Sequence, residues 1–180
     1  QKCCDLIACG LDELLQMDIQ LVVLGTGEKR YEEMFRNAAS KYPEKVSANL
    51  KYDEVLAQRI YAGSDMFLMP SLYEPCGLSQ LIGLRYGAVP VVRETGGLKD
   101  TVEPYNEFTG EGTGFTFANY NAHEMLDAIR RAMRFYKEKD IWSTIMKNGM
   151  KRDFSWGRSA KQYLELYERL LHKESWNQMA

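Results

Sequence analysis

The sequence predicts an α/β domain in which a doubly wound parallel sheet is covered by helices on both faces. Strand-like and helix-like patterns alternate almost throughout the chain, and neither an internal repeat nor a low-complexity segment interrupts them. The 180 residues suffice for one domain with a sizeable core. Their 45% hydrophobic and 27% charged content is ordinary for a soluble globular protein.

The first half of the chain contains three helix patterns and two strand patterns. Leucines and an isoleucine at helical spacing predict an opening helix near the start of the chain. The apolar run at 19–24 predicts a buried strand that stops at the turn Gly25–Gly27. Three elements follow: a helix over 29–42 that ends before Pro43, a strand over 46–52, and a helix over 53–64 with Asp53 as N-cap.

The second half continues the alternation and then becomes helical. Strands are predicted over 66–69, 89–92 and 114–117, helices over 77–86 and 99–102, and a surface loop over 104–113. Asn121 and Glu124 have the spacing of a capping box at the start of a further helix. Two more helices, from Trp142 and from about Trp156, are expected to close the chain.

Charge and cysteine usage exclude several classes of function. The formal net charge is −2, from 23 basic and 25 acidic residues, and this balance argues against a nucleic-acid or anionic-membrane surface. No apolar run is long enough for a membrane span and no signal-peptide pattern opens the chain, so we expect a cytoplasmic protein. Cys3, Cys4, Cys9 and Cys76 match no zinc spacing, and reduced thiols without a metal are expected.

Unusual residues occupy the turns that follow the predicted strands, where open α/β sheets bind their ligands. These turns are 25–27, 51–53, 71–79 and 94–97, and Lys2 adds a cation near the first helix. The chain has no Gly-x-Gly-x-x-Gly fingerprint, no phosphate-binding P-loop and no Gly-x-Ser-x-Gly elbow. A diphosphate site made from helix N-termini, glycine turns and a lysine remains.

Each of these residues also has a simpler interpretation. The pair Gly96-Gly97 could be only a turn, Tyr52 a packing residue at a strand end, and Lys2 a solvated side chain. Glu74 could be a surface acid that complements the dipole of the helix behind it, and Cys76 a small buried residue. Their occurrence together at consecutive strand ends favours the site.

Two stretches carry a resemblance to a known family. Residues 70–87, PSLYEPCGLSQLIGLRYG, and 89–102, VPVVRETGGLKDTV, closely resemble bacterial glycogen synthases and plant starch synthases, the retaining family-5 glycosyltransferases that use ADP-glucose. The resemblance runs from Gln1 to about Leu171. It implies the C-terminal half of a two-domain glycosyltransferase B fold. Residues 1–154 would be a Rossmann-like sugar-nucleotide-binding domain with its first strand truncated, and 155–174 a helix that crosses to the N-terminal domain.

The resemblance also implies roles for individual residues. Glu74 would be the active-site glutamate that binds the hydroxyls of the donor glucose, and Lys2 would neutralise the leaving ADP. Cys3 follows Lys2 where the family has a glycine, which is a departure from the motif. Tyr52 would stack on adenine. The remaining substrate-binding residues would be Cys76, Gly77, Leu78, Ser79, Thr95, Gly96, Gly97, Gly25 and Gly27.

The implied reaction is transfer of glucose from ADP-glucose to the non-reducing end of an α-1,4-glucan, with retention and without a cofactor or metal. The glucan acceptor would bind through the N-terminal domain, so we expect the 180 residues alone to be inactive. Two alternatives stay open: a stand-alone nucleotide-binding module, and a UDP-glucose-dependent transferase of the sucrose- or trehalose-forming type.

Overall fold

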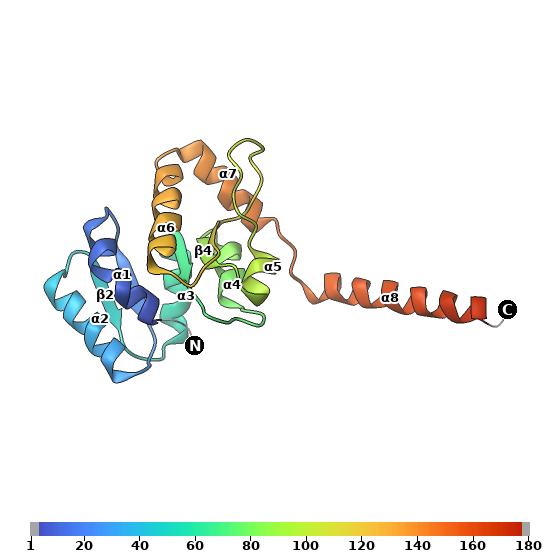
Figure 1. Ribbon diagram of the computed structural model, residues 1–180, viewed down its shortest axis with the longest axis horizontal. Coiled ribbons are helices and arrows are strands. Elements are labelled where there is room, and N and C mark those ends of the chain that lie inside the picture. Colours follow the sequence, from blue (N-terminus) through green and yellow to red (C-terminus); the bar gives the residue numbers. More distant parts are fainter. Residues whose placement is uncertain (1–3, 178–180) are drawn as a thin grey trace. The chain divides into compact units, whose positions relative to one another are not determined.

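The computed structural model describes residues 4–177, and their contacts divide the chain into two compact units (Figure 1). The first unit extends to Met150 and the second begins at Lys151, whereas the sequence suggests a boundary at 154. Lys2 and Cys3 lie outside the described residues.

The first unit alternates strands and helices along the chain, as predicted. Its elements are α1 (Cys4–Gln16), β1 (Leu21–Leu24), α2 (Lys29–Lys41), β2 (Val46–Asn49), α3 (Glu54–Gly63), β3 (Met66–Met69), α4 (Ser79–Tyr86), β4 (Val89–Arg93), α5 (Gly96–Thr101), β5 (Phe115–Phe117), α6 (Ala122–Tyr136) and α7 (Lys139–Met150).

All strand pairings in the described residues are parallel, which confirms the predicted fold class. β1 pairs with β2, and Leu21 lies opposite Val46. A second group runs in the order β3-β4-β5, with Met66 opposite Val89 and Val91 opposite Phe115. Parallel neighbours need a crossover connection, and a helix fills each of these crossovers. The carboxyl ends of the strands in each group therefore share one edge.

Strand β4 lies in the core. Val89, Val91 and Val92 are fully buried, as expected for a central parallel strand covered on both faces. One face of β4 packs in a cluster with the apolar stripe of α6, which includes Met125 and Ile129. Phe115 and Trp142 stack with ring centroids 6.3 Å apart, so β5 and α7 join the same core.

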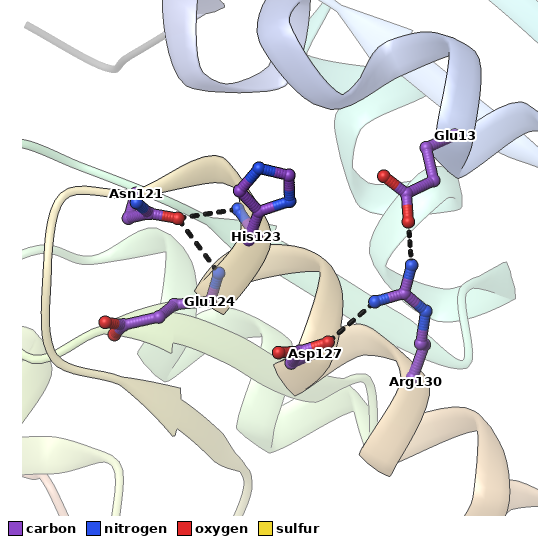
Figure 2. Close-up of polar contacts among 6 residues, drawn as sticks. All are labelled: Glu13, Asn121, His123, Glu124, Asp127 and Arg130. Carbon is purple, nitrogen blue, oxygen red and sulfur yellow. Dashed lines mark hydrogen bonds and ion pairs between the residues drawn. The ribbon is translucent and has the colours of Figure 1, made fainter.

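Helix α6 begins at a polar cap that the sequence predicts only in part (Figure 2). The side-chain oxygen of Asn121 accepts from the backbone N–H groups of His123 (2.8 Å) and Glu124 (3.3 Å), as an N-cap should. The reciprocal bond of a capping box is replaced, because Glu124 accepts instead from the backbone N–H and side-chain amide of Asn119. These bonds lower the pKa of the Glu124 carboxyl, the side-chain amide bond being the main cause.

The cap at Asn121 gives a first prediction. Asn121→Ala is expected to lower the free energy of unfolding by about 1 kcal/mol, because two N–H groups of the first turn lose their acceptor. Urea denaturation measures this change. Asn121→Asp keeps the acceptor oxygen and serves as the control, and an Asp variant as unstable as the Ala variant would contradict the capping role.

Arg130 joins α6 to α1 on the same side of the molecule (Figure 2). Its guanidinium donates to Glu13 of α1 and, at 2.6 Å, to Asp127 one turn earlier in α6. Both partners are partly exposed, so each pair contributes little free energy by itself. The contact links the C-terminal part of α1 to α6.

The second unit consists of the segment from Lys151 and helix α8 (Trp156–Asn177). Large apolar side chains on α8 are exposed: Trp156, Tyr163, Leu164, Leu166, Tyr167, Leu170 and Leu171. In the part of the chain that the structure covers, no helix has the length and apolar character needed to cross a membrane.

Candidate functional site

The turns that follow β3 and β4 lie against each other. The backbone N–H of Gly97 donates to the carbonyl oxygens of Glu74 (3.0 Å) and Pro75 (3.2 Å). A Cβ atom at Gly96 would overlap the backbone of Glu74, and a Cβ at Gly97 would overlap the backbone of Cys76. Both positions therefore require glycine for a close approach of two main chains. Gly96-Gly97 thus packs against the turn after β3 in addition to turning the chain.

Helix α4 begins at Ser79, two residues later than predicted. Gly77 has φ +75°, in the left-handed region, and lies before the helix. Leu78 is the N-cap residue and makes no side-chain capping bond. The first N–H groups of a helix have no partner within the helix and carry partial positive charge. The turn Glu74–Leu78 therefore ends at the N-terminus of α4, which carries partial positive charge.

Helix α5 begins at Gly96, three residues earlier than predicted. Thr95 is its N-cap residue, and the backbone N–H of Leu98 donates to the carbonyl oxygen of Thr95 at 3.1 Å. The sequence suggested a later start because paired glycines usually disfavour a helix. Here the contact with the Glu74–Cys76 backbone holds both glycines in place, and tertiary contact overrides local preference.

The side chains of the turn after β3 face solvent to different degrees. Glu74 is partly buried, whereas Tyr73 and Leu78 on either side are largely exposed. Cys76 is exposed, so its interpretation as a small buried residue is wrong. The backbone of Cys76, rather than its thiol, packs against Gly97. Its Sγ donates weakly to the carbonyl oxygen of Gly77 at 3.6 Å.

Gly25, Gly27 and Tyr52 follow the strands of the other group. The N–H of Gly25 donates to the carbonyl oxygen of Asn49 at 3.1 Å, and the N–H of Gly27 donates to the Glu32 carboxylate at 2.9 Å. β2 ends at Asn49 rather than at Tyr52, and Tyr52 is 87% exposed. This exposure excludes the packing role at a strand end and leaves the ring face open to a ligand.

The predicted N-cap of α3 is confirmed beside Tyr52. The Asp53 carboxylate accepts from the backbone N–H of Leu56 at 2.9 Å and from Lys51 Nζ at 2.8 Å. The Lys51 bond first, and then the Leu56 bond, hold the pKa of the Asp53 carboxyl below its usual value. The cap thus fixes where α3 starts, at Glu54, two residues after Tyr52.

Hydrogen bonds connect only some segments of the predicted site to each other. Within the described residues, backbone bonds connect the segments 74–77 and 95–97, while Gly25, Gly27 and Tyr52 are held by the local contacts given above. No cluster of histidine, cysteine, aspartate and glutamate that could hold a metal ion occurs among residues 4–177. The common location of all these residues is the carboxyl edge of parallel strands.

Sequence reasoning missed three residues that support the turns. Arg93, at the end of β4, donates to the carbonyl oxygens of Ser71 (3.2 Å) and Leu72 (2.6 Å). Gln80 is completely buried in the first turn of α4, and its amide donates to Thr101 Oγ1 at 3.2 Å. The signal was present for two of them: Arg93 ends a buried apolar strand, and Gln80 directly precedes the apolar stretch 81–84 of the predicted helix.

A parallel sheet with glycine-lined turns at its carboxyl edge places the chain in the class of doubly wound α/β domains that bind ligands at that edge. The chain belongs to the family of glycosyl transferases group 1, whose family model matches residues 7–148. Within that family it is similar to curated glycogen synthases. It is 57% identical to the glycogen synthase of Desulforamulus reducens over 171 residues and 61% identical to that of Lachnospira eligens over 171 residues. These alignments cover 95% and 94% of this chain.

A solved structure extends the similarity to plants. The catalytic domain of starch synthase IV from Arabidopsis thaliana, bound to ADP and acarbose, superposes with a TM-score of 0.81 and 38% identity. That superposition covers 94% of this chain and 36% of the plant chain. The chain likewise spans 36% of the length of both curated relatives. A sucrose-phosphate synthase from Thermosynechococcus elongatus, at 22% identity and TM-score 0.68, shares the fold.

Proposed function

We propose that this chain is the donor-binding domain of a glycogen or starch synthase. The whole enzyme would transfer glucose from ADP-glucose to the non-reducing end of an α-1,4-glucan with retention. The observation that supports this most is the contact of the Gly96-Gly97 turn with the backbone of 74–76. It places a carboxylate-bearing turn and the start of α4 at one edge of the sheet, in a chain that is 57% identical to a glycogen synthase.

The proposed roles follow from charge. The α4 N-terminus, with Gly77, Leu78 and Ser79, would meet the diphosphate, since backbone N–H groups there favour an anion. The Glu74 carboxylate would accept hydrogen bonds from glucose hydroxyls rather than face the phosphates, which repel it. Cys76, Thr95, Gly96 and Gly97 would line the space between them. Lys2, outside the described residues, would add the cation that neutralises the departing ADP.

Tyr52, Gly25 and Gly27 would complete the nucleotide site. The exposed ring of Tyr52 offers a face on which adenine can stack, and the glycine turn lets the ligand approach the backbone. The ADP-bound plant starch synthase supports a nucleotide in this fold. We further propose that neither nucleic acid nor a membrane is a partner and that the protein is cytoplasmic.

In this proposal the chain uses no general base. It would position the donor and stabilise the charge that develops on the departing diphosphate. Both effects depend on the geometry of the turns, because hydrogen-bond donors act in the transition state only if they are already in place. A cofactor is not needed, since ADP-glucose is itself the activated donor.

Donor titration tests the proposed function. Isothermal calorimetry of the 180-residue chain with ADP, ADP-glucose and UDP-glucose is expected to show binding of both adenine ligands, with UDP-glucose at least about tenfold weaker. Preference for UDP-glucose would assign the chain to the sucrose- or trehalose-forming transferases. Binding of ADP without any affinity for ADP-glucose would leave a nucleotide-binding module.

A second prediction concerns activity. The chain spans 36% of the length of its curated relatives, so we expect the 180 residues by themselves to bind the donor and to transfer no glucose. Transfer of labelled glucose from ADP-glucose to glycogen measures this, with a full-length glycogen synthase as the positive control. Incorporation above the enzyme-free blank would show that these residues contain the acceptor site as well.

A further inference from the structure

A buried glutamine lies beneath the two turns of the proposed donor site. Gln80 is completely buried, and its Nε2 donates to the carbonyl oxygens of Cys76 and Gly77, both at 3.1 Å, and to Thr101 Oγ1 at 3.2 Å. The two carbonyl oxygens can only accept, so the NH2 group must face them. The orientation of the amide is therefore fixed by its surroundings.

Thr101 continues this contact to the other turn. Its hydroxyl donates to the carbonyl oxygen of Gly97 at 2.5 Å and, having used its proton, can only accept from Gln80. Side chains thus connect the Cys76-Gly77 backbone, through Gln80 and Thr101, to Gly97. The backbone bonds from Gly97 to Glu74 and Pro75 connect the same two turns a second time.

The position of Gln80 is hard to explain by stability alone. An apolar side chain in the first turn of α4 would avoid the desolvation of an amide, which hydrogen bonds offset only in part. Within the described residues Oε1 of Gln80 has no hydrogen-bond partner, so burial of this amide carries a cost. A Cβ atom at Gly77 would overlap the same amide, so the buried position of Gln80 requires a glycine at 77.

We propose that Gln80 and Thr101 are positioning residues that hold the turn of Glu74–Gly77 against the turn of Thr95–Gly97. Neither side chain needs to touch the donor. They act on the backbone that carries Glu74 and on the start of α4. Small displacements of these groups would misplace the bound donor. The contacts above support the claim that these two residues join the turns. The claimed effect on the donor rests on the proposed function.

Thr101 offers a matched pair of variants for a test. Thr101→Val keeps the shape and removes the hydroxyl, so the bond from Gln80 to Thr101 is lost and the Gly97 carbonyl loses one donor. Thr101→Ser keeps the hydroxyl and serves as the rescue. The readout is hydrogen exchange of the Gly97 amide, measured against the amide of Val92 in the buried strand β4, which reports global opening.

Exchange at Gly97 is expected to rise about tenfold or more in Thr101→Val, with Val92 unchanged, and to stay near the wild-type rate in Thr101→Ser. An unchanged rate at Gly97 in Thr101→Val would overturn the proposal. An equal rise at Val92 would also overturn it, because the hydroxyl would then serve general stability and not the placement of the turns.

Donor affinity separates this inference from the proposed function. In Thr101→Val the affinity for ADP-glucose is expected to fall about tenfold, with a smaller change for ADP, because misplacement of Glu74 affects the sugar first. If the wild-type chain binds no ADP-glucose, the proposed function is wrong. The Gly97 exchange rates would still decide whether Gln80 and Thr101 join the two turns.

Discussion

Glu74→Gln is expected to lower the turnover of the full-length enzyme by at least about two orders of magnitude while ADP binds nearly as before. The substitution preserves shape and removes charge. Hydrogen bonds from glucose hydroxyls to a carboxylate contribute about 1.5–3 kcal/mol each, and they become weaker when the acceptor is a neutral amide. Loss of these bonds lets the anomeric carbon move out of its reactive position, which affects the rate more than nucleotide binding.

Steady-state kinetics and ADP calorimetry on the same preparation measure both quantities. Glu33→Gln, at an exposed position on α2, makes the same chemical change elsewhere and is expected to leave turnover unchanged. If Glu74→Gln weakened ADP as strongly as ADP-glucose, the carboxylate would organise the nucleotide site, and its assignment to the sugar would be wrong.

Gly97→Ala is expected to have the second large effect. An alanine Cβ would overlap backbone atoms of Cys76, which cannot turn aside as a flexible side chain can. The two turns must then separate, with the loss of the bonds from the Gly97 N–H to Glu74 and Pro75. We expect the free energy of unfolding to fall by about 1–3 kcal/mol and the affinity for ADP-glucose to fall at least about tenfold.

Gly63→Ala provides the matched control for this prediction. Gly63 ends helix α3, and a Cβ built there meets no atom within 4 Å. Alanine at that position should leave the protein as stable as before or more stable by about 0.5–1 kcal/mol, because glycine is a poor helix former. Equal urea midpoints for Gly97→Ala and Gly63→Ala would show that the two turns separate without cost.

The fold could be predicted from the sequence because it depends on patterns that are local. The alternation of apolar runs with helical stripes predicted the described strands and helices, and the Asp53 cap was found from residue type and position alone. The element ends were less accurate. β2 stops three residues before the predicted Tyr52, and α4 starts two residues after the predicted Gly77, because a left-handed glycine precedes it.

In the candidate site, too, the features predicted from the sequence are local and the missed ones depend on tertiary packing. Glu74 and the glycines were predicted from motif and position and remain predictions as site residues, whereas the contacts of Gln80 and Thr101 were not predicted. The two residues are 21 positions apart in the sequence, and they meet only because α4 and α5 pack together. No local sequence pattern encodes this contact. The simpler interpretation of Cys76, a small buried residue, is wrong because the close approach of Gly97 is to its backbone and the side chain is exposed.

The division of the strands into two groups has a consequence for how the chain behaves on its own. Among the described residues β1 pairs only with β2 and β3 only with β4, so β1 and β3 each hydrogen-bond along one side. In the doubly wound strand order 3-2-1-4-5-6, strand 1 lies between strands 2 and 4. The strands β1 and β3 of this protein correspond to strands 2 and 4 of that order. Open strand edges are templates for further strands, and natural proteins protect them because they promote aggregation. An extended segment that added between β1 and β3 would continue the sheet and remove both edges. Because β1 and β3 each have an open edge among the described residues, we expect these residues at high concentration to associate edge to edge before they unfold.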